Sequence, residues 1–354
     1  MLLQYLAGFA RLGLGVGFID WSPEGGSEGR HGGSRVISAA LPRLASAAEV
    51  AILRGNETLP GWSTQRAQGL EDPLLVNVMG FLPHGGTGQR SRTVFLDIDP
   101  GFPQMWKELG LADVFEGHDA FVTIGENIGT QGCEIPTSGL EWITTKQPVV
   151  LDEWPVQVGP GEAWTSVASW RGAYGPVDFN GKRYGLRVHE FRKFVELPRI
   201  TGRRFRLALD IHPDETNDLA LLEKNGWELL DPKEAAGDPW SYRSFIQASR
   251  AEFGVAKNMY VETRGGWFSD RSICYLASGR PVLVQDTGIR DLYPTGEGLL
   301  TYSTLEEAAA GVEEIERDYA RHSRAAREIA EVFFDSTKVL SRLLERLRLA
   351  GLGR

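Results

Sequence analysis

The chain has 354 residues, which suits two α/β domains of ordinary size better than one. A formal net charge of −9 argues against general nucleic-acid binding, and the two cysteines, Cys133 and Cys274, are too few for a disulfide framework or a cysteine-rich zinc site. No stretch approaches the roughly 20 apolar residues of a membrane span, and no leader pattern is visible, so we expect a cytoplasmic protein without stable membrane insertion.

Apolar spacing and turn residues predict the elements of the first half of the chain. We expect helices at residues 2–12, 39–53 and 105–111, and strands at 16–20, 74–79, 93–97, 120–124 and 148–151. Glycine-rich loops are expected at residues 25–34, 83–88 and 125–139. A Rossmann-type half normally opens with a strand, whereas this chain opens with a helix, so its first strand is expected to be missing.

Residues 152–203 have weak periodicity and are interpreted as a connection between domains. A second alternating pattern follows, with predicted strands at residues 205–210, 227–230, 254–260, 282–285 and 299–302. Helices are predicted at residues 214–225, 240–252, 270–278 and from 304 onwards, ending in a basic amphipathic helix near 336–347. The pattern predicts two parallel-sheet domains, at residues 1–165 and 166–335, with a helix at 336–354 that could pack back on the first domain.

The segment around residues 260–288 carries the most informative chemistry. A double glycine, Gly265-Gly266, precedes a helix start that is rich in serine and aspartate. Glycines let the backbone approach a ligand, and the N–H groups and positive dipole end of a helix favour a diphosphate. Nearby cations could neutralise that diphosphate, although a simple Ser/Asp cap with exposed arginines is the alternative. The residues predicted to bind a donor here are Lys257, Arg264, Gly265, Gly266, Ser269, Asp270, Arg271 and Ser272.

The same segment resembles the donor-binding region of GT-B glycosyltransferases, in which a glycine turn and a helix precede Ala-x-Gly-x-Pro-Val. The matching residues here are Ala277-Ser-Gly279-Arg-Pro281-Val282. More narrowly, the chain is similar to uncharacterised bacterial glycosyltransferase-like proteins at residues 3–13, 95–101, 128–139, 266–269 and 294–298. The resemblance implies a GT-B-like α/β fold, in which two Rossmann-type domains face a cleft and the C-terminal one binds a nucleotide sugar such as a UDP-sugar.

The sequence departs from the GT-B pattern at one position that the resemblance makes important. Many GT-B enzymes place a glutamate five residues before the glycine of Ala-x-Gly-x-Pro, where it holds the donor ribose. Cys274 occupies that position here, so ribose recognition is expected to differ or to come from elsewhere, with Glu262 as one candidate.

Further candidates follow the ends of predicted strands. Asp97 or Asp99 could deprotonate an acceptor hydroxyl, although either could instead cap the turn before Pro100. His118 is a second candidate base, with a solvated turn residue as the alternative. The loop containing Gly125 and Asn127 could contact the acceptor.

Three residues after the donor helix could contribute to donor binding. Asp286 and Thr287 follow the strand at 282–285, and Glu297 is expected near the same edge, with ordinary turn chemistry as the alternative for Glu297. The pattern Asp-x-Asp at 97–99 also resembles a metal motif of the GT-A fold. The second α/β block does not fit that fold, so no metal and no cofactor beyond the donor substrate is expected.

The sequence therefore predicts transfer of a hexosyl-type sugar from a nucleoside diphosphate to a hydroxyl. Two other hypotheses remain open, a non-catalytic GT-B-like binding protein and a nucleotide-sugar epimerase. No nucleic-acid partner is expected.

Overall fold

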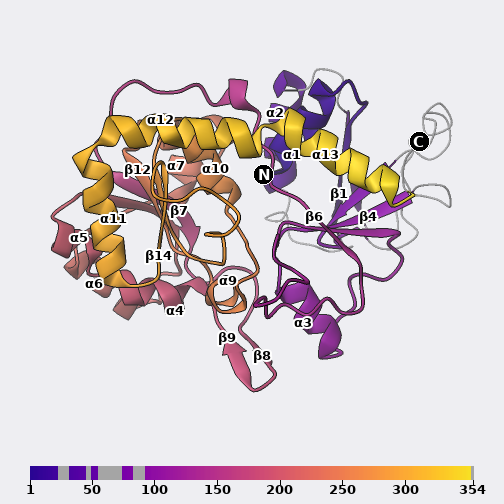
Figure 1. Cartoon of the computed structure of the whole chain (residues 1–354), viewed down its shortest axis with the longest axis horizontal. Coiled ribbons are helices and arrows are strands. Elements are labelled where there is room, and N and C mark those ends of the chain that lie inside the picture. Colours follow the sequence, from indigo (N-terminus) through magenta and orange to yellow (C-terminus); the bar gives the residue numbers. More distant parts are fainter. Residues whose placement is uncertain (23–31, 45–48, 55–73, 83–91, 352–354) are drawn as a thin grey trace. The chain divides into compact units, whose positions relative to one another are not determined.

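The computed structural model describes residues 1–22, 32–44, 49–54, 74–82 and 92–351. The chain forms two compact units (Figure 1). Unit 1 comprises Met1–Gly129, Pro136–Val150 and Ser336–Arg354, and unit 2 comprises Thr130–Ile135 and Leu151–Asp335. The loop predicted at residues 83–88 and most of the one predicted at 25–34 lie outside the described residues.

Unit 1 is built on a parallel sheet in the order β3-β4-β5-β6. Its strands are β3 (Leu74–Val78), β4 (Arg92–Asp97), β5 (Ala120–Thr123) and β6 (Trp142–Thr144), and a separate parallel pair joins β1 (Gly17–Ser22) to β2 (Glu49–Arg54). Its helices are α1 (Leu2–Arg11), α2 (Gly32–Leu44), α3 (Phe102–Glu108) and α13 (Ser336–Leu349).

Helices α1 and α13 lie side by side in unit 1 (Figure 1). Leu340, Leu343 and Leu347 recur at helical spacing on α13 and pack with Tyr5 of α1 against the sheet. Helices α1 and α13 thus share one core, which also contains Val94, Leu96, Ala120, Val122 and Ile143 of the strands.

Unit 2 is built on a six-stranded parallel sheet in the order β11-β10-β7-β12-β13-β14. Its strands are β7 (Trp164–Ser169), β10 (Phe205–Asp210), β11 (Trp227–Leu230), β12 (Ala251–Gly254), β13 (Val282–Gln285) and β14 (Leu299–Tyr302), with an antiparallel hairpin of β8 (Val177–Phe179) and β9 (Lys182–Tyr184).

Helices and short helical turns connect the strands of unit 2. They are η3 (Leu151–Glu153), α4 (Arg187–Phe191), η4 (Arg192–Phe194), α5 (Leu197–Thr201), α6 (Thr216–Lys224), α7 (Pro232–Ala236), α8 (Pro239–Ala248), α9 (Asn258–Thr263), α10 (Asp270–Ala277), α11 (Leu305–Arg317), α12 (Tyr319–Ile329) and the π-helical turn η5 (Ala330–Phe334). Aromatic side chains of the strands, including Trp164, Phe205, Trp227, Phe253 and Tyr302, fill the core on one face of the sheet.

The strand order of unit 2 reverses between β7 and β12. From β7 the chain runs outward through β10 to β11, and it then returns to β12 on the other side of β7. In open α/β sheets such a reversal opens a crevice at the carboxyl ends of the two strands, where ligands bind. The loops that follow β7, β12 and β13 are therefore the first place to look for a site.

Several predicted strands have the boundaries that the sequence indicates, notably β10, β11, β13 and β14. Other predictions are wrong. Residues 49–54 form strand β2 rather than the end of a helix, 148–151 is not a strand, and the supposed connection at 152–203 contains the central strand β7. The strand predicted at 254–260 is β12 at 251–254 followed by helix α9. Short apolar runs do not distinguish strand from helix by periodicity, which explains the errors at residues 49–54 and 254–260.

The second predicted domain was expected to begin at residue 166, whereas unit 2 takes in the chain from Leu151 and the separate segment Thr130–Ile135. Among the described residues, no helix is both long and apolar enough to cross a membrane.

Candidate functional site

The glycine turn, defined as residues Gly265 to Ser272, joins α9 to α10 in unit 2. Ser269 is the N-cap of α10, and its hydroxyl accepts a hydrogen bond from the Arg271 amide at 3.3 Å. The first amide N–H groups of a helix have no partners within the helix, and they lie at the positive end of its dipole. The turn therefore presents the backbone groups that an anionic ligand requires.

Hydrogen bonds to the loop after β13 hold the backbone of the glycine turn. The Gly266 amide donates to the Thr287 carbonyl oxygen at 2.9 Å, and the Thr287 hydroxyl donates to the Trp267 carbonyl oxygen at 2.5 Å. Gly266 has φ of 73°, a left-handed conformation that glycine adopts without cost. Thr287, predicted as a donor ligand, thus fastens the turn to the edge of the sheet.

Gly265 is required for close packing. A Cβ atom at Gly265 would lie 2.5 Å from Cδ1 of Ile135, well inside van der Waals contact. Ile135 belongs to the segment Thr130–Ile135 of unit 2, and the neighbouring Glu134 amide donates to the Thr263 carbonyl oxygen at 2.8 Å. This segment therefore packs directly against the first residue of the turn.

The two arginines of the predicted site have different environments. Arg264 is half exposed, adopts a left-handed φ of 51°, and has a guanidinium nitrogen 3.7 Å from the Asp286 carboxylate. Asp286 is buried and also accepts the amides of Gly288 and Ile289 at 3.0 and 3.2 Å. Arg264, which directly precedes the turn, is thus the arginine that solvent, and an incoming anion, can reach.

Arg271 lies beneath the turn rather than on its surface. Its Nε donates to Glu252 Oε1 at 2.5 Å, and its Nη1 donates to the Val167 carbonyl oxygen at 2.8 Å. The side chain of Arg271 is 11% exposed and that of Glu252 is fully buried. Burial lowers the pKa of Arg271, whereas the nearby Glu252 carboxylate raises it by a larger amount. The net pKa therefore lies above its ordinary value, and the arginine stays charged. Arg271 thus forms an internal ion pair with Glu252, whereas the sequence suggested a cation that faces the ligand.

Lys257 lies at the crossover between β7 and β12. Its ammonium group is 5.7 Å from the ring centre of Tyr174, in the loop after β7, and 5.2 Å from that of Tyr260 in α9. The faces of aromatic rings attract a cation, so these contacts hold the lysine near the crevice. Arg187 joins the same two loops, since it donates to the Ser169 and Val255 carbonyl oxygens at 2.9 and 3.0 Å.

A small cavity of about 10 Å³ lies under the glycine turn, which is room for about one water molecule. Ser272 contributes a fully buried hydroxyl that has no hydrogen-bond partner in the described structure. The polar residues that line the cavity are Ser269, Arg271, Ser272, Gln285 and Thr287. The start of α10 thus has an unused hydroxyl next to its first amides.

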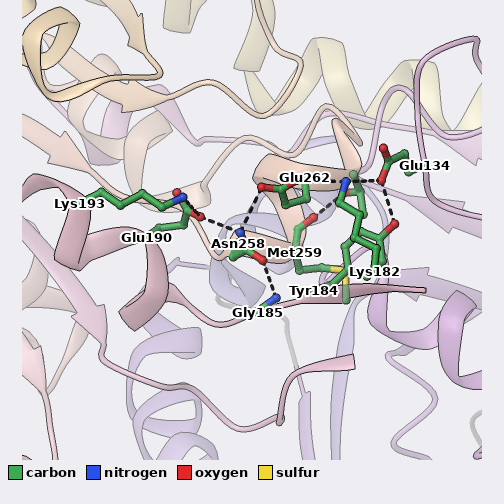
Figure 2. A network of polar contacts seen from close by, with 10 residues as sticks. Glu134, Lys182, Tyr184, Gly185, Glu190, Lys193, Asn258, Met259 and Glu262 are labelled. Atoms are coloured by element: carbon green, nitrogen blue, oxygen red, sulfur yellow. Dashed lines mark hydrogen bonds and ion pairs between the residues drawn. The ribbon is translucent and has the colours of Figure 1, made fainter. Parts of the chain in front are cut away.

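A network of polar side chains lies beside the elements that carry the loops of the site (Figure 2). Buried Glu190 accepts hydrogen bonds from Lys193 and Asn258, both at 2.7 Å, and from Gln285 at 2.5 Å. Asn258 in turn accepts from the Gly185 amide at 2.6 Å. These residues carry no local signal in the sequence, because they lie on separate elements that only the fold brings together.

Glu262, the candidate for ribose recognition, belongs to a second part of the same network (Figure 2). Lys182 of the β8–β9 hairpin bridges Glu262 at 3.0 Å and Glu134 at 2.7 Å. The Tyr184 hydroxyl donates to Glu134 at 2.8 Å, and burial together with that carboxylate raises the pKa of Tyr184 to about 12. Glu262 is therefore paired with a lysine, while Cys274 is buried in α10 and its pKa is raised by burial.

Asp97 is the last residue of β4 in unit 1 and is fully buried. Its carboxylate accepts hydrogen bonds from the Gln104 amide and the Thr123 hydroxyl at 2.8 Å each, and from the Asp99 amide at 3.0 Å. Burial raises the pKa of Asp97 to about 6, although these donors oppose the rise. Asp99 is partly exposed, so it is the carboxylate of this pair that solvent can reach.

The remaining candidate residues of unit 1 lie at opposite ends of its parallel strands. Gly125 lies at the carboxyl edge, where its amide donates to the Thr123 hydroxyl at 3.0 Å, and Asn127 follows in the same loop. His118 precedes β5 and so lies at the amino edge, with its ring nitrogens 3.0 Å from the Asn77 side-chain amide and the Phe115 carbonyl oxygen. The fold separates His118 from Asp97 along the strands.

Glu297 is not at the edge where the sequence analysis expected it. It precedes β14, and the Val282 amide at the start of β13 donates to the Gly298 carbonyl oxygen at 2.8 Å. Because β13 and β14 are parallel, Glu297 lies at the amino edge of the sheet, opposite Asp286. There its carboxylate is 3.7 Å from Arg321. The expectation that it shares an edge with Asp286 is wrong.

No group of three or more histidine, cysteine or carboxylate side chains in the described part of the chain is arranged to hold a metal ion. The cations near the glycine turn are arginine and lysine side chains of unit 2.

Part of the chain resembles a known family in sequence, and the chain as a whole resembles solved proteins in fold. Residues 191–344, which include the glycine turn, match the glycosyl transferase-like family. HepE from Anabaena, solved in complex with UDP, is 12% identical, with 95% of this chain and 100% of that chain covered and a TM-score of 0.52. AviGT4, a glycosyltransferase involved in avilamycin A biosynthesis, is 12% identical, with 96% and 98% covered and a TM-score of 0.55.

The sucrose-phosphate synthase from Thermosynechococcus elongatus gives a similar result, with 12% identity, 95% of this chain and 99% of that chain covered, and a TM-score of 0.54. The chain has the GT-B glycosyltransferase fold. No curated protein matches it in sequence. The two parallel-sheet units thus correspond to the two Rossmann-type domains of the GT-B fold, and the glycine turn lies in the segment that matches the glycosyl transferase-like family.

Proposed function

We propose that this GT-B protein transfers a hexosyl group from a UDP-sugar to a hydroxyl group of an acceptor. One observation carries the proposal. The start of α10 follows a glycine turn that is hydrogen-bonded to the carboxyl end of β13, inside the region that matches the glycosyl transferase-like family. The choice of UDP is supported by HepE, a protein of the same fold that was solved with UDP and with UDP-glucose.

The diphosphate would lie at the first turn of α10, where amide N–H groups and the helix dipole favour negative charge. Arg264 is half exposed beside this turn, and Lys257 follows the adjacent strand β12. As the bond between the anomeric carbon and the diphosphate breaks, these groups would stabilise the charge that develops on the leaving UDP. The proposal needs no metal ion for that task.

The acceptor hydroxyl would attack the anomeric carbon and give up its proton to a carboxylate. Asp99 is the better candidate for that base, because it is partly exposed. Asp97 is fully buried and holds three hydrogen bonds, which suits it to shaping the loop that carries Asp99. Gly125 and Asn127 are proposed to contact the acceptor from the neighbouring loop.

Calorimetric titration with UDP, GDP, dTDP and their glucose conjugates tests the donor assignment. We expect binding of UDP and UDP-glucose, and a loss of about tenfold in affinity for Arg264→Met, a typical cost for one charged contact. Glu297→Gln is the matched control, since Glu297 lies at the opposite edge of the sheet and its removal should leave affinity unchanged. Failure of the wild-type chain to bind any of these nucleotides would overturn the proposal.

Two product assays separate the transferase from its alternatives. A transferase releases UDP from UDP-glucose slowly in water and faster when a hydroxyl acceptor is added. An epimerase converts the donor into its isomer without releasing UDP, and a binding protein leaves it unchanged. Conversion to the isomer, or the absence of any UDP release with a broad set of acceptors, would contradict transfer.

A further inference from the structure

The ion pair between Arg271 and Glu252 lies where the helix start meets the centre of the sheet. Glu252 is in the middle of β12, where it pairs in register with Thr165 of β7 and Val282 of β13. Arg271 is the second residue of α10, and it also reaches the Val167 carbonyl oxygen of β7. One guanidinium thus connects the first turn of α10 to both strands that flank the crossover.

Gly254, the last residue of β12, lies next to this pair. A Cβ atom there would lie 2.7 Å from Val284 Cγ1, 3.4 Å from Glu252 Oε1 and 3.6 Å from Arg271 Nη2. Gly254 has no positive φ, so its backbone does not require glycine. The small residue is therefore explained by the close approach of Val284, whereas Glu252 and Arg271 would lie at ordinary contact distance.

The pair is not an efficient way to gain stability. A buried ion pair is often no more stabilising than apolar residues of similar volume, because both charges lose their hydration. Here the cost is incompletely offset, since Glu252 Oε2 has no hydrogen-bond partner in the described structure. The pair instead fixes the orientation of the start of α10, because a guanidinium bound to a carboxylate and a carbonyl oxygen permits little movement of the helix start.

We propose that Arg271 is a positioning residue of the donor site, which fixes the first turn of α10 over β7 and β12 so that its amides meet the diphosphate in the required place. This inference rests on the proposed function, and it assigns Arg271 a different task from that of Arg264. Arg264 acts on the ligand through its charge. Arg271 acts through the backbone that it holds, because its own charge is balanced by Glu252 at 2.5 Å.

The decisive variant replaces both partners, Glu252→Leu together with Arg271→Met, which avoids leaving one buried charge alone. We expect it to remain folded while its Kd for UDP rises at least tenfold. Arg271→Lys keeps the charge but cannot make both contacts, so an intermediate loss is expected. Arg280→Met is the matched control, since Arg280 is also a buried arginine that binds carbonyl oxygens, those of Gln247 and Gly159, at the far end of α10.

Two readouts distinguish positioning from other roles. The dependence of UDP affinity on salt concentration should keep its wild-type slope in Arg271→Lys and in the double variant, whereas loss of a cation that touches the diphosphate would lower the slope. Hydrogen exchange of the amides of residues 269–273 in the unliganded double variant should be at least tenfold faster than in the wild type, with the β13 amides unchanged.

The inference is overturned if the double variant binds UDP as tightly as the wild type, or if Arg280→Met loses as much affinity. It is also overturned if the helix-start amides stay equally protected. The exchange measurement needs no ligand, so it tests whether Arg271 holds the turn even if the wild-type chain binds no nucleotide. Failure of the wild-type chain to bind any nucleotide would refute the proposed function, not the positioning role of Arg271.

Discussion

At the carboxyl ends of the strands, each unit has a buried charged group that is held by hydrogen bonds, but the chemistry of that group differs between the two units. In unit 1, a buried carboxylate at the end of β4 is surrounded by neutral donors from Gln104, Thr123 and a backbone amide. In unit 2, a buried arginine under α10 is bound by a carboxylate and a carbonyl oxygen. Each buried group holds a loop, and a more exposed charged neighbour, Asp99 or Arg264, is left available to solvent.

This comparison shows that the charged residue most strongly held at an edge need not be the one that meets a ligand. Asp97 and Arg271 are both polar residues at sequence positions typical of ligand contacts, yet their side chains are directed into the protein. The following predictions test whether burial separates structural from functional residues at both edges.

The largest effect is expected for Asp97→Ala. The substitution leaves three donors, two of them buried, without their acceptor, and we expect the free energy of unfolding at pH 5 to fall by about 3 kcal/mol. Urea denaturation measures this loss. UDP affinity of the folded variant should stay at the wild-type value, because the glycine turn belongs to unit 2. Weaker UDP binding without any loss of stability would contradict the structural role of Asp97.

Gly265→Ala should affect the other edge. The new methyl group would overlap Ile135 Cδ1, which must move and would displace the turn. We expect a loss of about tenfold in UDP affinity, equivalent to about 1.4 kcal/mol, measured by calorimetry. Adding Ile135→Val, which removes the overlapping atom, should restore most of the affinity. If the second substitution does not restore it, the packing explanation for Gly265 is wrong.

The elevated pKa of Asp97, about 6, predicts a smaller effect of pH. The native carboxyl binds its proton more tightly than the unfolded one, whose pKa is near 3.8, so protonation favours the native state. Stability from this group is present at low pH and is lost as pH rises through about 6. Between pH 7 and 5 we expect the wild type to gain about 1 kcal/mol relative to Asp97→Asn.

The measurement is a pair of urea denaturation series at matched pH values. Taking the difference between wild type and Asp97→Asn cancels the other carboxylates, among them Asp218 and Glu228, whose pKa values are lowered and which act in the opposite direction. A difference that stays constant with pH would show that Asp97 does not titrate in this range.

The sequence was informative where the signal is local. Strong apolar runs between turn residues predicted β10, β11, β13 and β14, and the glycine turn with its serine cap predicted the start of α10. It was not informative where the decisive contacts join distant residues. Glu252 is 19 positions from Arg271, and Glu190 is 95 positions from Gln285. No local pattern shows such pairs.

The error over β7 has a similar cause. Trp164–Ser169 contains polar residues, and its strand character comes from its place between β10 and β12 in the middle of the sheet. Thr165 is buried there because its hydroxyl lies 2.6 Å from those of Ser249 and Tyr275, a set of partners that only the fold assembles. Tertiary context overrode the propensity of the segment. The crossover next to β7, and with it the position of Lys257, could not be located without that strand.

The smallest effect is expected for Ser272→Ala. The Ser272 hydroxyl is buried beside the first amides of α10 and has no hydrogen-bond partner in the described structure, so its removal should change stability by less than about 0.5 kcal/mol. We expect UDP affinity to fall by about threefold in the same titration, at the weak end for one neutral hydrogen bond, because the hydroxyl then no longer donates to the diphosphate. Ser278→Ala provides the control, because the Ser278 hydroxyl at the other end of the same helix is equally buried and also has no hydrogen-bond partner in the described part of the chain. Equal affinities for the two variants would mean that the hydroxyl is only a packing group, and that the backbone alone receives the donor at this edge.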